Sequence, residues 1–461
     1  MKRIYRGLAL AAIVVAALVA AAPASAAVKT DTFRYPVTVK GYQVRQSISP
    51  AEHPHVDGFI TAMSADIVDE DGTPVPINRL MLHHIVFAKL GDPSSQCAQY
   101  TPFDASQKLP GLAQPLFGEG EEHNRLVLPP GYGLPMKKDD IWANVWMLMN
   151  HRKETDHAFI EWKVTYDDDP NADLTPVTPY WLDVKNCNAD PIFNVPGGGA
   201  AGSTYSKSYT LNMPESGHIV AAGGHVHGGA ENLSISQPAC GDRQIMQMDP
   251  AWGMPDHPFY HVRPILHEPG PIAVSGYLSA QGFPVAQGQP IKLTATYDNV
   301  LPHTRVMGIA MIYVAHSDQP VDGCGPLPSD AQEFVTDQPH RTAPPRFKVP
   351  IVGIGPDGIA RDISHPPGTT RTLKSGSTIL ARDFFFNRPN VRVSAGARLK
   401  WNILSKTPGE MHNVTLASGP RGFGSKNYSK GKFAYRFKTR GKYRIFCALH
   451  PVAMTEVVTV K

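Results

Sequence analysis

The sequence predicts an all-β protein, and three observations indicate this fold class. The chain of 461 residues contains 40 glycines and 43 prolines, which favour turns and oppose long helices. It contains no long amphipathic helical stretch. Short runs of β-branched and aromatic residues alternate instead with turn residues, at 159–166, 219–222, 291–297 and 306–314. At this length we expect two or three domains.

Residues 1–26 have the features of a secretory signal peptide. Lys2, Arg3 and Arg6 give a positive start, residues 8–22 are apolar, and residues 24–26 read Ala-Ser-Ala, a small-residue cleavage site. No other apolar run approaches the ~20 residues that a membrane-spanning helix needs. We therefore expect a secreted, periplasmic or otherwise extracytoplasmic protein without a membrane span.

The next part of the chain carries histidines in or beside apolar runs. His83 and His84 are adjacent inside one such run, and His151 ends another. His225 and His227 alternate on a predicted strand, where positions i and i+2 face one side, so this pair can chelate one ion. Neighbouring His83 and His84 nominally face opposite sides of a strand, so a shared ion requires a β-bulge there.

These histidines, in this order and followed by Met307 in a later apolar run, resemble the copper type II, ascorbate-dependent monooxygenases of the peptidylglycine hydroxylating and dopamine β-monooxygenase type. The His-His run is also similar to that of the stress-upregulated nodulin-like proteins. The monooxygenase resemblance implies two packed antiparallel β-sandwich domains, here residues 27–185 and 186–325.

The same resemblance implies two copper sites. His83, His84 and His151 are expected to hold one copper, which stores an electron. A second set is expected to hold the catalytic copper, and its members are His225, His227 and Met307. Met311 and His303 are alternatives to Met307. A soft thioether ligand favours Cu(I), the form that reacts with O2.

The segment 326–375 is rich in Pro, Gly, Asp and Thr and is predicted to be a linker with some local structure. After it, residues 376–461 contain a compact ligand pattern. Its members are His412, Cys447, His450 and Met454. A trigonal set of one Cys and two His with a weak axial Met suits copper that cycles between Cu(I) and Cu(II).

This pattern resembles the plastocyanin and pseudoazurin type of cupredoxin, which implies a Greek-key β-sandwich with a type 1 copper that carries electrons. The resemblance also implies that Asn413, directly after the first His ligand, braces the loop that contains Cys447. Met454 is the ligand with the less common spacing, since three residues separate it from His450.

The five cysteines divide into Cys447 and four others. Cys97, Cys187, Cys240 and Cys324 are an even number of widely spaced cysteines in a chain that we expect to be exported. They predict two disulfides, and three connectivities remain open.

Charge is unevenly distributed along the chain. Residues 376–461 contain 16 Lys and Arg but 3 Asp and Glu, a net charge near +13, whereas the whole chain has +4, which leaves the rest near −9. Opposite charges favour docking between the two parts. The alternative is a basic face that meets an acidic polymer, cell wall or membrane. The basic residues lack the helix or aromatic context of a nucleic-acid module, so no nucleic-acid partner is expected.

Together these features imply a secreted multicopper redox protein. The resemblance favours a copper-dependent monooxygenase that hydroxylates a C–H bond with O2, with the cupredoxin domain supplying electrons. An external donor such as ascorbate or another redox protein, and a small-molecule or peptide substrate, are the expected partners. The alternative is a non-enzymatic copper-binding, copper-delivery or electron-transfer protein of the cell envelope. Whether the chain is an enzyme, its substrate and its oligomeric state stay open at this stage.

Overall fold

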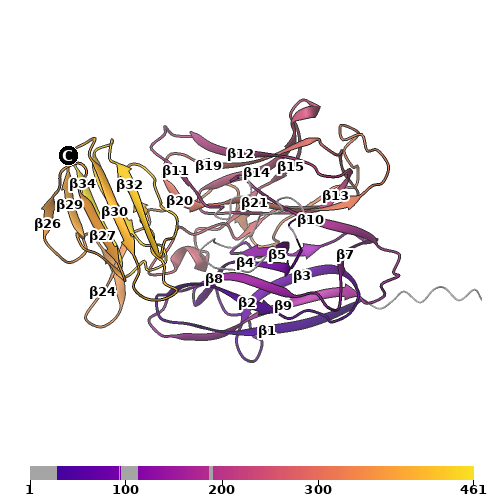
Figure 1. Ribbon diagram of the computed structural model, residues 1–461, viewed down its shortest axis with the longest axis horizontal. Helices are drawn as coiled ribbons and strands as arrows, with labels where there is room; N and C mark the ends of the chain where they lie inside the picture. Colours follow the sequence, from indigo (N-terminus) through magenta and orange to yellow (C-terminus); the bar gives the residue numbers. More distant parts are fainter. Residues whose placement is uncertain (1–27, 93, 95–112, 186–190) are drawn as a thin grey trace, which may run out of the picture.

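The computed structural model describes residues 28–92, 94, 113–185 and 191–461. Its regular structure is almost entirely β-strand, which confirms the predicted fold class (Figure 1). Within the described ranges the helical elements are two 3-10 turns, η1 (Pro238–Cys240) and η2 (Pro258–His261). Neither has the length and apolarity that crossing a membrane requires. The predicted signal peptide, Cys97 and Cys187 lie outside the described residues.

The first β-sandwich consists of two packed sheets. One sheet has the order β2 (Val44–Ala51), β8 (Trp142–Asn150), β4 (Leu80–Leu90) and β5 (Ala113–Gly120). The facing strands are β1 (Lys29–Val39), β9 (Asp156–Asp167), β3 (Gly58–Val68), β6 (Leu126–Val127) and β7 (Tyr132–Met136). Alternate residues of β3 and β9 are buried, as expected of strands with one face on a core. Trp146, Trp162 and Phe87 fill the space between the sheets.

The second β-sandwich is joined to the first along one edge. Its inner strands are β10 (Thr175–Asp183), β21 (Gly308–His316), β13 (Gly217–Val226), β18 (Gly276–Val285) and β22 (Gln332–Phe334). Its outer strands are β12 (Thr204–Asn212), β19 (Pro290–Asp298), β14 (Ala230–Gln237) and β15 (Arg243–Met248). Because β7 pairs with β10, the sheet of the first sandwich that contains β1 and the inner sheet of the second sandwich that ends at β22 form one continuous sheet of ten strands. Strand β10 lies before the predicted boundary at residue 185 but pairs with β21.

The two sandwiches also pack face to face. In Figure 1, β4, β5 and β8 lie next to β10, β13 and β21. The Tyr313 hydroxyl donates to the carbonyl of Leu116 at 2.9 Å, and Gln114 Nε2 donates to the carbonyl of Pro179 at 3.0 Å. These bonds join β5 of the first sandwich to β21 and β10 of the second, so they hold the two facing sheets together.

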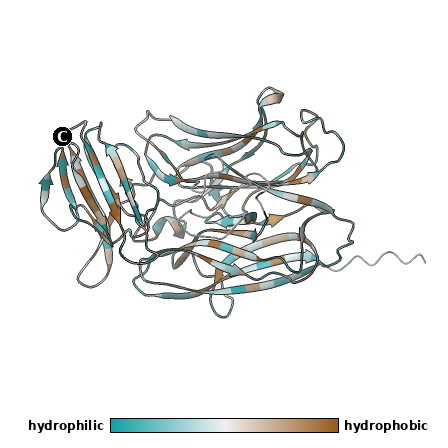
Figure 2. Ribbon diagram, viewed as in Figure 1, coloured by the Kyte–Doolittle hydropathy of each residue, from teal (hydrophilic) through white to brown (hydrophobic). Residues whose placement is uncertain are grey.

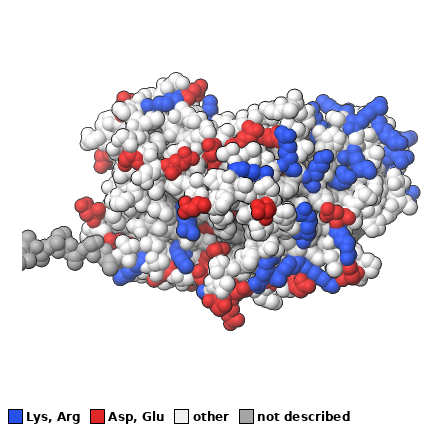
Figure 3. Space-filling model, turned by 180° about the vertical axis from the view of Figure 1, so that it is seen from behind, with Lys and Arg blue, Asp and Glu red and all other residues white. Residues whose placement is uncertain are grey.

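The C-terminal domain is a third β-sandwich. One sheet has the order β26 (Thr370–Thr372), β29 (Asn390–Val393), β34 (Thr455–Val460), β33 (Gly441–Phe446) and β31 (Thr415–Ser418). The other has the order β28 (Phe385–Phe386), β27 (Thr378–Arg382), β30 (Arg398–Leu404) and β32 (Lys430–Arg436). Hydrophobic and hydrophilic residues alternate along these strands (Figure 2), and Trp401, Phe437 and Tyr443 are buried between the sheets. Many of the Lys and Arg side chains of Figure 3 gather on this domain.

Residues 326–375, predicted as a linker, are packed against the rest of the chain through short strands. Strand β22 pairs with β18, β23 (His340–Arg341) pairs with β16 (Pro250–Gly253), and β26 belongs to the C-terminal sheet. Between them, β24 (Ile351–Ile354) and β25 (Ala360–Ile363) form a hairpin that touches the first sandwich, where Ala360 N donates to the Tyr42 hydroxyl at 3.1 Å. Strand β16 also pairs with β17 (Ala273–Val274). The segment is therefore a docked connection.

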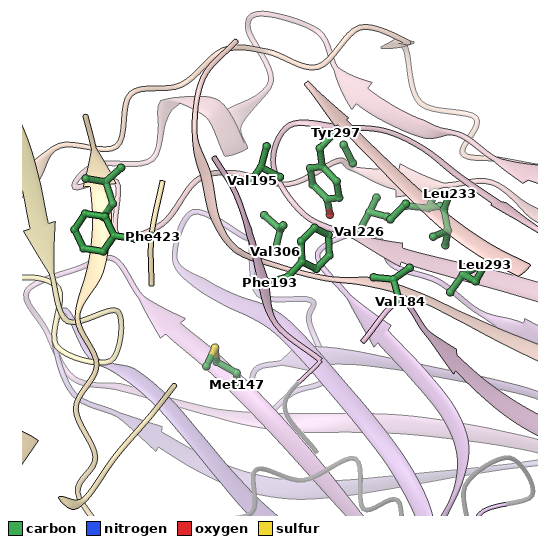
Figure 4. Packing of buried hydrophobic residues seen from close by; sticks show 14 of the residues in the cluster. Met147, Val184, Phe193, Val195, Val226, Leu233, Leu293, Tyr297, Val306 and Phe423 are labelled. Carbon is green, nitrogen blue, oxygen red and sulfur yellow. The ribbon is translucent and has the colours of Figure 1, made fainter. Parts of the chain in front are cut away.

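The C-terminal domain contacts the second sandwich through the short pair β11 (Phe193–Val195) and β20 (His303–Val306). Gly422 N donates to the carbonyl of Pro196 at 2.8 Å, and Arg305 Nη1 donates to the carbonyl of Ser425 at 3.0 Å. Phe193, Val306 and Phe423 belong to one continuous cluster of buried hydrophobic residues (Figure 4). Apolar packing and bonds to backbone carbonyls thus hold the domains together.

Of the predicted disulfides, the structure contains Cys240–Cys324. Cys447 is a free, buried thiol, as the ligand pattern requires.

Candidate metal centres

The C-terminal centre is formed by three loop residues at one end of the third sandwich. The ligand atoms of His412, Cys447 and His450 all lie within 4.8 Å of one another. His412 Nδ1 and His450 Nδ1 are 3.2 Å apart, and Cys447 Sγ is 3.6 Å from His450 Nδ1. Cys447 directly follows β33 and His412 lies shortly before β31, and these paired strands bring the two loops together. The sequence pattern therefore corresponds to one cluster.

Carboxylates hold the two imidazoles in this orientation. His412 Nε2 is 3.0 Å from Asp383 Oδ1, and His450 Nε2 is 3.1 Å from Glu410 Oε2. With Nε2 bonded to a carboxylate, each ring is left with Nδ1 facing the thiol. Metal-binding histidines typically donate their other N–H to a carboxylate in this way.

Asn413 braces the Cys447 loop, as the cupredoxin resemblance implies. Asn413 Oδ1 accepts hydrogen bonds from Ala448 N at 2.8 Å and from the Thr415 hydroxyl at 2.9 Å. Asn413 N lies 3.3 Å from Cys447 Sγ, to which it donates. One buried side chain therefore links the His412 segment to the Cys447 segment.

Met454 closes the same loop and is fully buried. Its carbonyl accepts from Cys447 N at 2.9 Å, and its N–H donates to the carbonyl of His450 at 3.0 Å. Burial raises the pKa of the Cys447 thiol, so a thiolate in this position needs a nearby cation. A thiol, two imidazoles and a neighbouring thioether form a soft donor set that fits copper.

In the central region, a β-bulge places His83 and His84 on the same side. The register between β4 and β8 shifts between Leu82 and His84, which leaves His83 as an extra residue. The two rings consequently lie 5.2 Å apart, centroid to centroid. The bulge that the sequence required is confirmed.

At the end of β13, His225 and the residue just after the strand, His227, face one side, as their spacing predicts. Their Nε2 atoms are 3.1 Å apart. Across the interface between the sandwiches, the ring of His227 is 4.9 Å from that of His83, and the ring of His225 is 6.4 Å from that of His84. The histidines that the sequence assigned to two separate coppers therefore lie side by side in one cluster, which we call the central cluster.

His151 reaches the same region from the end of β8. Its Nδ1 is 3.0 Å from the carbonyl of Pro264, while its Nε2 is buried and has no hydrogen-bond partner. Burial lowers the pKa of His151 to about 4, so the ring is neutral at pH 7 and has a free lone pair. Its nearest described ring partner is His267, at 6.3 Å.

Three further side chains belong to the central cluster and were not predicted. Glu121 and Glu122 directly follow β5, and Glu121 Oε1 is hydrogen-bonded to His83 Nδ1 and to His267 Nε2, the latter at 2.7 Å. Glu122 Oε1 is 2.6 Å from His225 Nδ1. The adjacent carboxylates of Glu121 and Glu122, directly after β5, are the sequence signal that points to this site.

The protonation of the cluster follows from burial and from these carboxylates. Burial opposes ionisation of Glu121, but His267 and His83 outweigh it and hold the pKa of Glu121 well below its usual range. Burial, with the neighbouring His225 and His83, holds the pKa of His227 well below its usual value. Burial opposes protonation of His225, but Glu122 outweighs it and raises the pKa of His225 above its usual value. Neutral imidazoles and ionised carboxylates are the protonation states that bind metal ions.

Met307 lies between β20 and β21, is buried, and lines two cavities beside the cluster. Of its alternatives, Met311 lines one of these cavities. His303 is buried and lines neither cavity, and its Nδ1 is 2.9 Å from Glu268, which lines the second one. Of the three candidates, Met307 is the one that lines both cavities.

The first cavity, of about 110 Å³, lies between the two sandwiches and is mainly apolar. His84, His225 and Met307 line it together with apolar residues such as Phe117 and Ile309. The polar side chains Gln46, Glu119, Asn124, Arg125, Arg305 and Asn427 also belong to its lining. We call it the apolar cavity. It could hold a small hydrophobic molecule directly beside the central cluster.

The second cavity, of about 70 Å³, extends from the central cluster toward the C-terminal domain. His83 and His227 line one part of it, and Phe446 and Ala448, the two neighbours of Cys447, line another. We call it the bridging cavity. The two metal-ligand clusters therefore approach the same space.

No protein-family model matches the chain, and no curated protein matches it. Among solved structures, an oxidised mutant of amicyanin is 18% identical, with 19% of this chain and 90% of that chain covered and a TM-score of 0.16. Reduced auracyanin from the photosynthetic bacterium Roseiflexus castenholzii is 15% identical, with 21% and 99% covered and a TM-score of 0.16. These values describe a likeness over about a fifth of the chain and carry no argument about its activity.

Proposed function

We propose that this chain is an exported copper-dependent redox enzyme. Its C-terminal domain carries electrons, and its central cluster uses O2 to hydroxylate a C–H bond of a small apolar substrate. The observation that supports this most directly is the bridging cavity, which is lined by His83 and His227 of the central cluster and by Phe446 and Ala448, the two neighbours of Cys447. An electron carrier and an electron-consuming site that border the same cavity are suited to electron transfer within one molecule.

In the C-terminal domain, His412, Cys447, His450 and Met454 would hold a type 1 copper, which supplies a one-electron change at little structural cost. Asp383 and Glu410 orient the imidazoles, and Asn413 holds the two ligand loops together. A preformed site of this kind binds the two oxidation states with similar geometry.

In the central cluster, His225, His227 and Met307 would hold the copper that takes part in O2 chemistry. Glu122 orients His225, and the walls of the apolar cavity exclude water and hold the substrate. The overall reaction consumes a substrate C–H bond, O2, two electrons and two protons, and gives C–OH and water. An external reductant such as ascorbate or another redox protein would supply the electrons one at a time.

The experiment is a comparison of metal content, spectra and O2 consumption in the secreted protein. Wild type should bind copper in both regions and consume O2 with a reductant and a small apolar substrate. His225→Ala should abolish substrate-dependent O2 consumption and keep the visible absorption of the C-terminal copper. If the copper-loaded wild type consumes no more O2 with substrate than without it, and mass spectrometry detects no hydroxylated product, the chain is better described as a copper-binding or electron-transfer protein of the cell envelope.

A further inference from the structure

We infer that Glu121 and His267 are metal ligands, which with His83 and His151 form a second centre in the central cluster that takes a divalent transition-metal ion. This inference rests on the proposed function only for the identification of the metal as copper. The donor set, three imidazole nitrogens and one carboxylate oxygen, differs from the all-histidine set that the sequence implied.

The ligand atoms already converge. Those of His83, Glu121 and His267 all lie within 4.8 Å of one another, and the rings of His83 and His267 are 4.8 Å apart. One oxygen, Glu121 Oε1, accepts from both imidazoles. A single ion that replaces the two protons would meet all three groups with small movements.

The carboxylate cannot easily turn away. Glu121 Oε2 accepts from Gly270 N at 2.9 Å, and a Cβ on Gly270 would lie 2.6 Å from this oxygen, so a larger residue would displace it. Glu121 is buried, and a buried carboxylate is stable only when it is paired or binds a metal ion. The backbone thus holds Glu121 with one oxygen directed at the two histidines.

The fourth donor is the unpaired nitrogen of His151. Its ring lies beside that of His267, and its Nε2 is buried with no hydrogen-bond partner. The opposite nitrogen, Nδ1, is bonded to the carbonyl of Pro264. A backbone carbonyl behind one imidazole nitrogen and a free lone pair on the other is the usual arrangement of a metal-binding histidine.

The donor atoms of this centre differ from those of the neighbouring site around Met307. A carboxylate is a hard donor that favours a divalent ion, whereas the thioether of Met307, beside His84 and His225, favours Cu(I). The two centres should therefore differ in the oxidation state they prefer. Among divalent ions, Cu²⁺ is expected to bind more tightly than Zn²⁺.

The test uses the full chain with the Cys447→Ser change, which weakens the C-terminal site, after removal of metals with a chelator. Cu²⁺ or Zn²⁺ is then titrated against a chelator of known affinity. Glu121→Gln keeps an acceptor for Gly270 N but loses the anionic ligand. This variant should bind one equivalent fewer of Cu²⁺ and of Zn²⁺. Its affinity for that ion should fall by more than the ~10–100-fold that follows loss of a residue that only orients a ligand.

Glu119→Gln is the matched control, because Glu119 is a buried carboxylate on β5, two residues before Glu121, whose Oε2 accepts from Ala65 N at 2.7 Å. It should bind as many equivalents as the parent. His267→Ala should lose the same equivalent as Glu121→Gln, and the EPR signal of that Cu²⁺ should be absent from both. Circular dichroism checks that the variants are folded.

Unchanged Cu²⁺ and Zn²⁺ binding in folded Glu121→Gln would overturn the inference, as would a loss of affinity of up to about 100-fold, which indicates an orienting role. Failure of the proposed function looks different. In that case the equivalent that depends on Glu121 is still bound, but the copper-loaded protein forms no hydroxylated product.

Discussion

The Thr304 hydroxyl donates to the backbone carbonyl of Leu416 at 2.8 Å and so joins the two metal-binding parts of the chain. Thr304 lies on β20, which ends directly before Met307. Leu416 lies on β31, which pairs with β33 next to Cys447. This contact fixes the distance between the central cluster and the C-terminal centre, and the bridging cavity lies beside it.

We expect Gly422→Val to slow electron transfer between the two parts several-fold. A Cβ on Gly422 would lie 2.3 Å from the carbonyl oxygen of Val195, so the substitution must push the domains apart. The measurement is the rate at which the reduced C-terminal centre regains its colour after mixing with O2. Thr439→Val, at an exposed position of the same domain, is the control. Equal rates in Gly422→Val and wild type would show that electrons do not pass between the two parts through this interface.

Cys447→Ser should abolish the intense visible absorption of the oxidised protein, because this absorption requires a thiolate bound to Cu(II). The loss is expected to be complete, since a hydroxyl is a hard, weak ligand for copper. His365→Ala, which removes a histidine of the preceding connecting segment that is bonded to Asn390 of the C-terminal domain, should keep the colour. A coloured Cys447→Ser protein would contradict the assignment of this centre.

Gly223→Leu should block the apolar cavity. A Cβ at Gly223 meets no atom within 4 Å, so a larger side chain can enter the cavity without displacing its walls. We expect loss of turnover with small apolar substrates and unchanged metal content, with stability unchanged or raised by about 1 kcal/mol. Met311→Ala, which enlarges the same cavity, should shift the preference toward larger substrates. Normal turnover in Gly223→Leu would place the substrate elsewhere.

Asp183→Asn should change the pH dependence of stability. Asp183 is buried, its Oδ2 has no hydrogen-bond partner, and burial raises its pKa from 3.8 to about 6. The folded protein therefore binds more protons than the unfolded chain between these values, and the unfolding free energy of wild type falls as pH rises through this window. The fall attributable to Asp183 is up to about 3 kcal/mol.

Denaturant unfolding at pH 4 and pH 7 measures this effect. Asp183→Asn should gain stability relative to wild type from the lower to the higher pH, because the amide does not titrate. The comparison with wild type cancels the titration of all other groups. A constant difference between the two proteins would show that Asp183 titrates normally.

Removing the Cys240–Cys324 disulfide should destabilise the second sandwich by about 2–5 kcal/mol, since the bond closes a loop with a sequence separation of 84 residues. Cys324→Ser is the variant, and thermal unfolding is the measurement. Mass spectrometry after alkylation without reduction provides a second check. It should label Cys447 of the metal-free protein and leave Cys240 unlabelled; labelling of Cys240 would refute the bond.

Features that depend on short stretches of chain could be predicted from the sequence. The pair His225 and His227 faces one side because the side-chain period of a strand is two residues. Cys447 and His450 share one loop, so their spacing alone brings the ligand atoms together. The alternation of apolar and turn residues likewise gave the all-β fold class.

The composition of the central cluster could not be predicted in the same way. Glu121 and His267 are separated by 146 residues, and they meet because the end of β5 packs against the loop after η2. His83 and His227 belong to different sandwiches, and the contact between their rings depends on how two apolar sheet faces pack. No local period encodes which distant segments bury each other.

Backbone geometry fixes where neighbouring side chains point, so the all-β class, the local ligand pairs and the C-terminal His, Cys and Met pattern could be read from the residues alone. The long-range arrangement could not: that the two predicted histidine sets form one cluster, that Glu121 joins them, and that residues 326–375 are packed. These outcomes depend on burial of apolar faces between segments far apart in the chain, such as β4 and β13 or β20 and β31.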